Sequence, residues 1–110
     1  MGGLPELAWN NKAIALYNLG KFNESLQAYD RAIQIGPRYE LAWYNKGAVL
    51  ANLGKYNESI QAYDRAIQIS PLDVDAWNGK GKALGDLGKS NESLLAYDRA
   101  IQINPRFELG

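Results

Sequence analysis

Three Asn-x-Ser patterns are the first residues in this sequence that suggest a chemistry. They occur in the stretches GKFNES, GKYNES and GKSNES, where the acceptor residues are Asn23, Asn57 and Asn91. Asn-x-Ser is the acceptor pattern for N-glycosylation. The three asparagines are 34 residues apart, however, and the three tryptophans share that spacing: Trp9, Trp43 and Trp77. A repeated structural unit is therefore a simpler cause of the pattern than a repeated modification.

Recurring carboxylates are the second candidate for chemistry. An aspartate followed directly by an arginine appears once in each unit, at Asp30, Asp64 and Asp98. The chain has no His and no Cys, which removes the commonest general base, thiol nucleophiles and the commonest metal ligands. The same Asp-Arg pair in every unit is typical of a solvated structural face. We predict no enzymatic activity, no cofactor and no bound metal.

Composition limits the class of protein and of partner. With 46% apolar and 22% charged residues in 110, the chain has the composition of one ordinary globular domain. Twelve basic residues balance 12 acidic ones without a run of like charge, so neither nucleic acid nor a membrane surface is an expected partner. The N-terminus has no basic and apolar leader, which favours a cytoplasmic location.

Each unit has the apolar spacing of two helices. Trp9, Ala13 and Leu16 fall at i, i+4 and i+7, and a second set falls at i, i+3 and i+7: Leu26, Tyr29 and Ile33. After the second set, Pro37 stops the second helix. Between the two sets, Gly20 suits the left-handed residue that ends a helix. A turn this short predicts an antiparallel helical hairpin.

The asparagine of each Asn-x-Ser pattern lies where the second helix should begin. An Asn side chain there accepts a hydrogen bond from an unpaired backbone N–H, and Glu24 just inside favours the positive end of the helix. We predict that Asn23, Asn57 and Asn91 are helix N-caps, with glycosylation as the alternative.

The spacing of Trp, Gly, Tyr, Ala and Pro resembles the tetratricopeptide repeat. In the second unit the matching residues are Trp43, Gly47, Tyr63, Ala66 and Pro71. The resemblance covers residues 6–107, as units 6–39, 40–73 and 74–107, after a leader at 1–5. It implies an all-α, right-handed superhelical solenoid. The sequence departs from the family at two positions, where Lys12, Lys46 and Lys80 replace a Leu, and Ser25, Ser59 and Ser93 replace an Ala.

The resemblance implies that the first helices line a groove, and the residues there are rich in amides with some aromatic and apolar side chains. They are Asn10, Asn11, Ile14, Tyr17, Asn18, Leu41, Tyr44, Asn45, Asn52, Asn78 and Lys82. Asn pairs with a peptide backbone through donor and acceptor, and Tyr supplies contact area. We predict a scaffold that binds a protein or peptide ligand; the alternative is that these amides only keep an exposed helix face soluble.

Some members of the family grip the acidic C-terminus of heat-shock chaperones with a clamp of Lys, Asn and Arg. The matching positions here are Asn10, Ile14, Asn45, Asp75 and Gly79. Only Asn45 agrees with the clamp, and Asp75 has the wrong charge for a carboxylate ligand. A chaperone-tail adaptor is therefore not predicted.

A self-assembling structural module is the alternative function. The end of the sequence, PRFELG, echoes the PRYELA that opens the second unit, so residues 108–110 look like the start of a truncated fourth repeat. Arrays of this kind need a cover over the last hairpin. We therefore expect weak self-association through the C-terminal face, with four apolar candidates: Leu94, Leu95, Tyr97 and Ile101.

Overall fold

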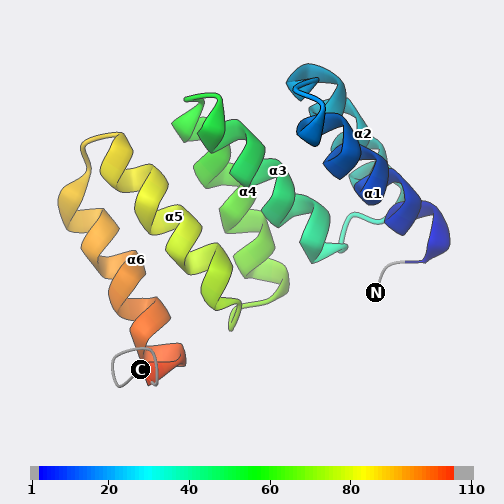
Figure 1. Cartoon of the computed structure of the whole chain (residues 1–110). Coiled ribbons are helices and arrows are strands. Elements are labelled where there is room, and N and C mark those ends of the chain that lie inside the picture. The colour runs from blue at the N-terminus through cyan, green and yellow to red at the C-terminus, as the bar shows by residue number, and fades with distance from the viewer. Residues whose placement is uncertain (1–2, 106–110) are drawn as a thin grey trace.

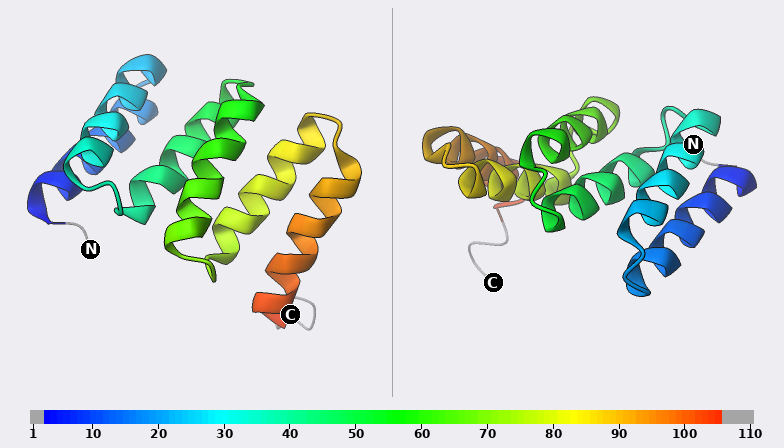
Figure 2. Two further views of the ribbon diagram at one scale, coloured as in Figure 1. Left: turned by 180° about the vertical axis from the view of Figure 1, so that it is seen from behind. Right: turned by 90° about the horizontal axis from the view of Figure 1, so that it is seen from above.

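Six α-helices account for most of residues 3–105, the part of the chain that the computed structural model describes. They are α1 (Leu4–Asn18), α2 (Phe22–Ile35), α3 (Glu40–Asn52), α4 (Tyr56–Ile69), α5 (Val74–Asp86) and α6 (Ser90–Ile103). Consecutive helices form three antiparallel hairpins in a row (Figure 1). Helices α1, α3 and α5 lie on one face, called here the odd-helix face, and α2, α4 and α6 lie on the other (Figure 2). The predicted all-α solenoid of helix-turn-helix repeats is confirmed.

A left-handed glycine closes the first helix of each hairpin. The φ angles of Gly20, Gly54 and Gly88 are 78°, 77° and 89°, a region that other residues rarely adopt. In the first turn, Lys21 N donates to Leu16 O at 2.9 Å and Gly20 N donates to Tyr17 O at 2.9 Å. These bonds satisfy carbonyls that the end of α1 leaves unpaired. The predicted role of these glycines is confirmed.

The predicted capping role of the asparagines is wrong. The residues that precede α2, α4 and α6 are lysines, Lys21, Lys55 and Lys89, and no side chain caps these helices. Asn57 is the second residue of α4 and is exposed. The glycine turn leaves only one non-helical residue after it, so the helix begins one residue before the asparagine.

The serine of each Asn-x-Ser pattern has the structural role instead. Ser25 Oγ donates to Ala13 O at 2.7 Å, Ser59 Oγ to Gly47 O at 2.7 Å, and Ser93 Oγ to Gly81 O at 2.6 Å. All three serines are buried. Each bond joins the two helices of one hairpin, which accounts for Ser where the family has Ala.

The core is built from small residues and tyrosine rings. Ala13, Ala32 and Ala66 are fully buried, and Tyr29 and Tyr63 are only 2% and 4% exposed. A Cβ atom on Gly47 would lie 3.0 Å from the Tyr63 ring, so glycine allows α3 and α4 to approach closely. Burial raises the pKa of Tyr29 and of Tyr63 to about 12.

Two boundary expectations concern the ends of the chain. Helix α1 begins at Leu4, within the predicted leader 1–5, with Pro5 in its first turn. The predicted start of a fourth repeat, residues 108–110, lies outside the described residues. Among the helices of residues 3–105, none combines the length and the apolar character that a membrane span requires.

Candidate functional site

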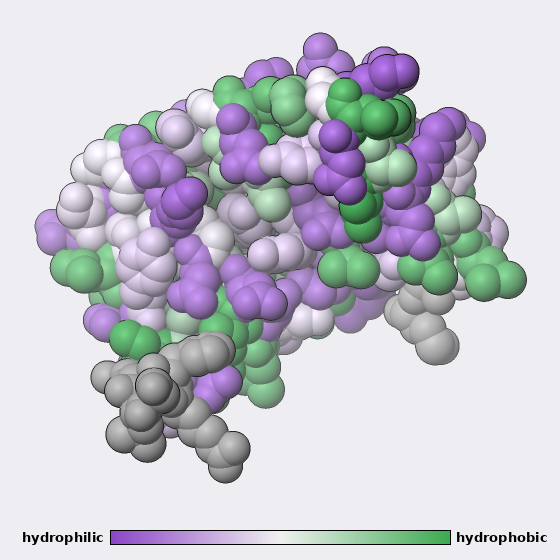
Figure 3. Space-filling view, in the orientation of Figure 1, coloured by the Kyte–Doolittle hydropathy of each residue, from purple (hydrophilic) through white to green (hydrophobic). Residues whose placement is uncertain are grey.

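The odd-helix face is a mixture of polar and apolar patches. Figure 3 shows this face, where the apolar side chains of the described residues are interspersed with hydrophilic ones. The residues predicted for the site do not form one cluster on this face. They divide between the junction of the first and second repeats, the region around Tyr44, and isolated exposed positions.

The first junction contains a pocket of about 170 Å³. Its lining residues are Ile14, Tyr17, Tyr29, Asn45, Ala48, Val49 and Asn52. Four of them belong to the predicted site: Ile14, Tyr17, Asn45 and Asn52. The other three, Tyr29, Ala48 and Val49, are not predicted from the sequence, because apolar spacing assigns Tyr29 to the core and gives no sign that α2 contributes to this pocket.

The identity of one residue on each odd helix explains why the pocket lies at this junction. Gly79 occupies the position on α5 that Asn45 occupies on α3. A Cβ on Gly79 would lie only 2.5 Å from Cζ of Tyr63, so α5 packs closely against α4. At the first junction Asn45 fills that position beside Tyr29, and α3 makes a looser contact with α2. The separation leaves the pocket open.

Asn10 is a buried residue of α1 at this junction. It is 1% exposed, and its Oδ1 accepts a hydrogen bond from Asn45 Nδ2 at 3.2 Å. The prediction that Asn10 contacts a ligand is therefore wrong, because α3 covers its side chain. Asn10 Nδ2 is buried without a hydrogen-bond partner among the described residues. The residue orients the amide of Asn45 rather than presenting its own.

Tyr17 and Asn52 form the edge of the same pocket. Asn52 Nδ2 donates to the hydroxyl of Tyr17, which joins α1 to α3. The Tyr17 ring also lies 5.2 Å from the ring of Phe22, with the two planes tilted by 55°. Both contacts restrict the Tyr17 side chain, so this edge is ordered before any ligand arrives.

Tyr44 lies apart from the pocket, at the second junction. Its ring centroid is 5.7 Å from that of Tyr63, and its pKa is raised by burial and by the charges of Asp75, Asp73 and Glu40. Burial, together with Asp73 and Asp75, raises the pKa of Glu40 to about 8. This end of the face is therefore acidic.

The other predicted residues lie at exposed positions on the same face. They are Asn11, Asn18, Leu41, Asn78 and Lys82. Leu41 is 42% exposed. None of these five lines the pocket at the first junction.

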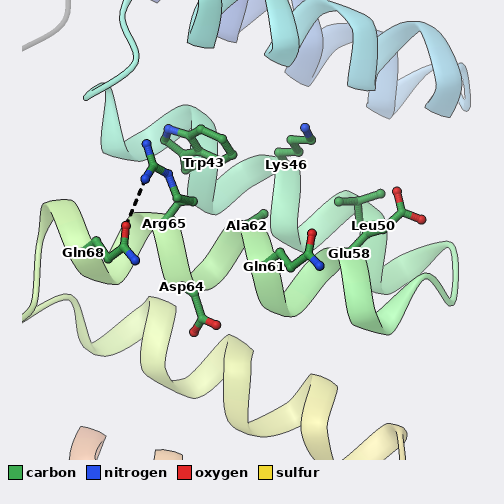
Figure 4. A pocket seen from close by; sticks show the side chains of 9 residues that line it. All are labelled: Trp43, Lys46, Leu50, Glu58, Gln61, Ala62, Asp64, Arg65 and Gln68. Carbon is green, nitrogen blue, oxygen red and sulfur yellow. Dashed lines mark hydrogen bonds between the residues drawn. The ribbon is translucent and has the colours of Figure 1, made fainter.

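Three further grooves run beside the tryptophans, one in each hairpin, with volumes of about 470, 410 and 300 Å³ from the first repeat to the third. In the second repeat the groove is lined by Trp43, Lys46, Arg65 and Gln68, among others (Figure 4). The Arg65 guanidinium lies 5.3 Å from the Trp43 ring and donates to Gln68 Oε1 at 3.1 Å. Trp43 and Gln68 of the same hairpin therefore already contact this arginine.

The described residues contain no group of three or more Asp, Glu, His or Cys side chains that could hold a metal ion. The candidate site therefore consists of amides, hydroxyls, apolar side chains and one acidic end. Such groups offer hydrogen-bond donors, hydrogen-bond acceptors and apolar surface.

Comparison with known proteins agrees with this architecture. The chain is similar in structure to MamA, with 24% identity and a TM-score of 0.88, over 92% of this chain and 55% of that one. It is similar to the second TPR of Spaghetti (RPAP3) bound to HSP90 peptide SRMEEVD, with 20% identity and a TM-score of 0.87, over 92% and 94% of the two chains. The Arabidopsis OM64 TPR domain gives 20% identity and a TM-score of 0.88, over 93% and 84%.

At the level of sequence, no curated protein matches the chain significantly. The chain spans about half the length of MamA, and identities this low show the fold alone. Two models described as tetratricopeptide repeat match the sequence, one over residues 10–74 and the other over residues 74–107. Together with the six helices in three hairpins, these matches show that the chain belongs to the tetratricopeptide repeat family.

Proposed function

We propose that this protein is a non-catalytic scaffold that binds an extended peptide segment across its odd-helix face. The observation that carries the proposal is the pocket of about 170 Å³ between the first two repeats. A cavity of about 150 Å³ admits a benzene molecule, so this pocket has room for one aliphatic or aromatic side chain of a ligand. The side chain would contact Ile14, Ala48 and Val49.

Amides at the rim of the pocket would bind the peptide backbone. Asn45 and Asn52 each carry donors and an acceptor, and their contacts with Asn10 and Tyr17 use only part of this capacity. Backbone pairing gives affinity, and the pocket gives specificity. The ligand is therefore an extended segment with one apolar anchor residue.

Charge on this face disfavours an acidic ligand. Asp73 and Asp75 lie together near Tyr44, beside Glu40, whose raised pKa keeps it largely uncharged at neutral pH, and the positions that match the chaperone clamp contain Ile14, Asp75 and Gly79. Two TPR domains of Spaghetti (RPAP3) are bound to an HSP90 peptide, SRMEEVD, that contains two glutamates. This chain keeps only Asn45 of the clamp, so we propose a neutral or basic peptide as its ligand.

Selection from a display library of random peptides tests the proposal. The whole chain is immobilised, and the selected peptides are measured in solution by fluorescence anisotropy against the parent chain and Ala48→Trp. Filling the pocket with an indole should weaken binding by at least about tenfold, the loss expected when one buried anchor contact is removed. The matched control is Gln61→Trp, which adds the same indole to an exposed position of α4.

Two results would count against this site. The first is a set of selected peptides that bind the parent chain and Ala48→Trp equally well. The second is a loss of binding in Gln61→Trp, which would move the ligand to the groove beside Trp43, where Gln61 is a lining residue. Circular dichroism spectra of both variants show whether the helical fold is retained.

A further inference from the structure

An ion pair recurs at each junction between repeats. Lys46 Nζ lies 2.8 Å from Asp30 Oδ1, and Lys80 Nζ lies 2.7 Å from Asp64 Oδ1. In both cases the lysine is on the first helix of one repeat and the aspartate is on the second helix of the repeat before it. The two pairs are 34 residues apart and therefore equivalent.

The two ends of the array carry the unpaired halves of the same contact. Lys12 is the equivalent of Lys46 and Lys80 on α1, and Asp98 is the equivalent of Asp30 and Asp64 on α6. Within residues 3–105 neither Lys12 nor Asp98 makes an ion pair. Lys12 Nζ lies 5.0 Å from the centre of the Trp9 ring, a contact that the paired Lys46 and Lys80 also make with their own tryptophans, and Asp98 is exposed.

Apolar residues of α1 flank Lys12 and form what we call the head face. Ala8 is exposed, whereas Ala42 and Ala76, its equivalents in the next two repeats, are fully buried. Leu19 is 71% exposed, and its equivalents are partly buried. Ala15 is likewise exposed at a position that is buried in the other repeats. The head face comprises Ala8, Lys12, Ala15 and Leu19, one stripe along α1.

Apolar residues of α6 flank Asp98 and form the tail face. Tyr97 is partly exposed, although its equivalents Tyr29 and Tyr63 are only 2% and 4% exposed. Leu94 is 61% exposed and Ile101 is 38% exposed, at positions that are partly buried in α2 and α4. The tail face comprises Leu94, Tyr97, Asp98 and Ile101.

Leu95 does not belong to the tail face, contrary to the sequence expectation. Its equivalents Gln27 and Gln61 stay exposed although another repeat follows them. Leu95 lines the groove beside Trp77, within its own hairpin. Its exposure is therefore shared by the equivalent residues Gln27 and Gln61 and is not a feature of the tail face.

We propose that copies of this chain associate head to tail, with the head face of one copy on the tail face of the next and with Lys12 paired to Asp98 across the junction. The internal junctions show that such a pair of faces packs when both are present. Each copy keeps one face unused, so the contact does not close and longer stacks form as concentration rises.

Charge selects this arrangement over a two-fold one. Two tail faces placed against each other would bring the Asp98 carboxylates of both copies together, and like charges disfavour such a contact. The head-to-tail contact places opposite charges together. Without a covalent link between the copies the association is weak, since the internal junctions gain from the high effective concentration of their partners.

Sedimentation velocity on the whole 110-residue chain tests the proposal, at concentrations from about 10 µM to about 1 mM, where weak contacts are populated. The parent chain should show a sedimentation coefficient that rises across this range. Lys12→Asp and Asp98→Lys should each shift the rise to a concentration about three- to tenfold higher, because attraction becomes repulsion at a partly exposed pair.

Combining the two reversals distinguishes the arrangements. The double variant Lys12→Asp/Asp98→Lys should associate as the parent chain does, and an equal mixture of the two single variants should associate more strongly than either variant alone. Ile101→Lys should weaken association, whereas Leu95→Gln and the charge-matched control Lys55→Asp should not. Thermal unfolding followed by circular dichroism checks that each variant is folded.

Three outcomes would overturn the proposal. One is a parent chain that stays monomeric over the whole range. Another is an effect of Ile101→Lys with none of Lys12→Asp or Asp98→Lys, which is the pattern of two tail faces in contact, where reversing both aspartates only replaces one like-charge pair by another. The third is failure of both the double variant and the mixture to recover association, which would mean that Lys12 and Asp98 do not meet.

Discussion

The ring of Tyr63 in the second repeat lies against Gly79 in the third, so closely that a Cβ on Gly79 would be 2.5 Å from Cζ of the ring. Tyr63 contacts Gly47 of its own repeat as well. One tyrosine thus fixes the spacing within a hairpin and the spacing to the next hairpin. The equivalent ring at the first junction, Tyr29, lines the pocket together with Asn45.

This contact predicts opposite effects for two glycines of α5. Alanine at position 79 must displace the Tyr63 ring, and we expect Gly79→Ala to lower the free energy of unfolding by about 1–3 kcal/mol. A Cβ on Gly85 would lie 3.4 Å from Ser93 Oγ, an ordinary contact, so Gly85→Ala should raise it by about 0.5–1 kcal/mol. Urea denaturation measures both changes, and stabilisation by Gly79→Ala would contradict the close packing.

The serine and the asparagine of one Asn-x-Ser pattern should contribute differently to stability. Ser59→Ala removes the buried bond to Gly47 O and should lower the free energy of unfolding by about 0.5–1.5 kcal/mol. Asn57→Ala changes an exposed residue with no capping bond, and should alter it by less than about 0.5 kcal/mol. Thermal unfolding of the two variants under identical conditions decides; a larger loss from Asn57→Ala would restore the capping interpretation.

The raised pKa of Glu40 predicts how the free energy of unfolding depends on pH. Burial and the neighbouring aspartates raise its pKa to about 8, from 4.5. The folded chain then binds more protons than the unfolded chain between these values, so the free energy of unfolding should fall as pH rises through this window. We expect a fall on the order of 1 kcal/mol after allowing for solvent screening of a partly exposed group, and Glu40→Gln should remove it. Denaturation curves of both chains across the window test this, and parallel pH profiles would contradict it.

Binding of a selected peptide should depend on the odd helices and not on the arginines of the even helices. Asn45→Ala should lower the affinity for the peptide by about tenfold, because an amide that pairs with the peptide backbone is lost. Tyr44→Ala should also lower the affinity, because contact area is lost. Arg31→Ala, Arg65→Ala and Arg99→Ala should leave affinity within about twofold. Anisotropy titrations compare the five variants, and a reversed order would place the ligand on the other face.

The fold follows from the sequence because its determinants are local. Apolar spacing, a left-handed glycine and a proline repeat every 34 residues, and each repeat contacts only its neighbours. The wrong prediction of a capping role for Asn57 also concerns a local feature, because a helix that begins one residue earlier turns a capping position into an exposed helical one. Ser59 was identified as a departure from the family, but its bond to Gly47 O requires the two helices to be in place.

The site was harder to predict because it depends on the distance between repeats. The sequence places Asn10 and Asn45 on the same face of equivalent helices, and only packing shows that one is buried beneath the other. The pocket exists because Asn45 stands where Gly79 stands in the next repeat. A comparison of Asn45 with Gly79 was the one sequence signal that could have indicated it.

Mapping of amide chemical shifts with a selected peptide tests peptide binding at the first junction most directly. The whole chain, labelled with ¹⁵N, is titrated with a peptide from the display selection, and shift changes are assigned to residues. The account predicts that the largest changes cluster at Ile14, Asn45 and Ala48, and that Ala48→Trp abolishes them. Changes concentrated instead at Trp43 and Arg65, in the groove of the second hairpin, would contradict it.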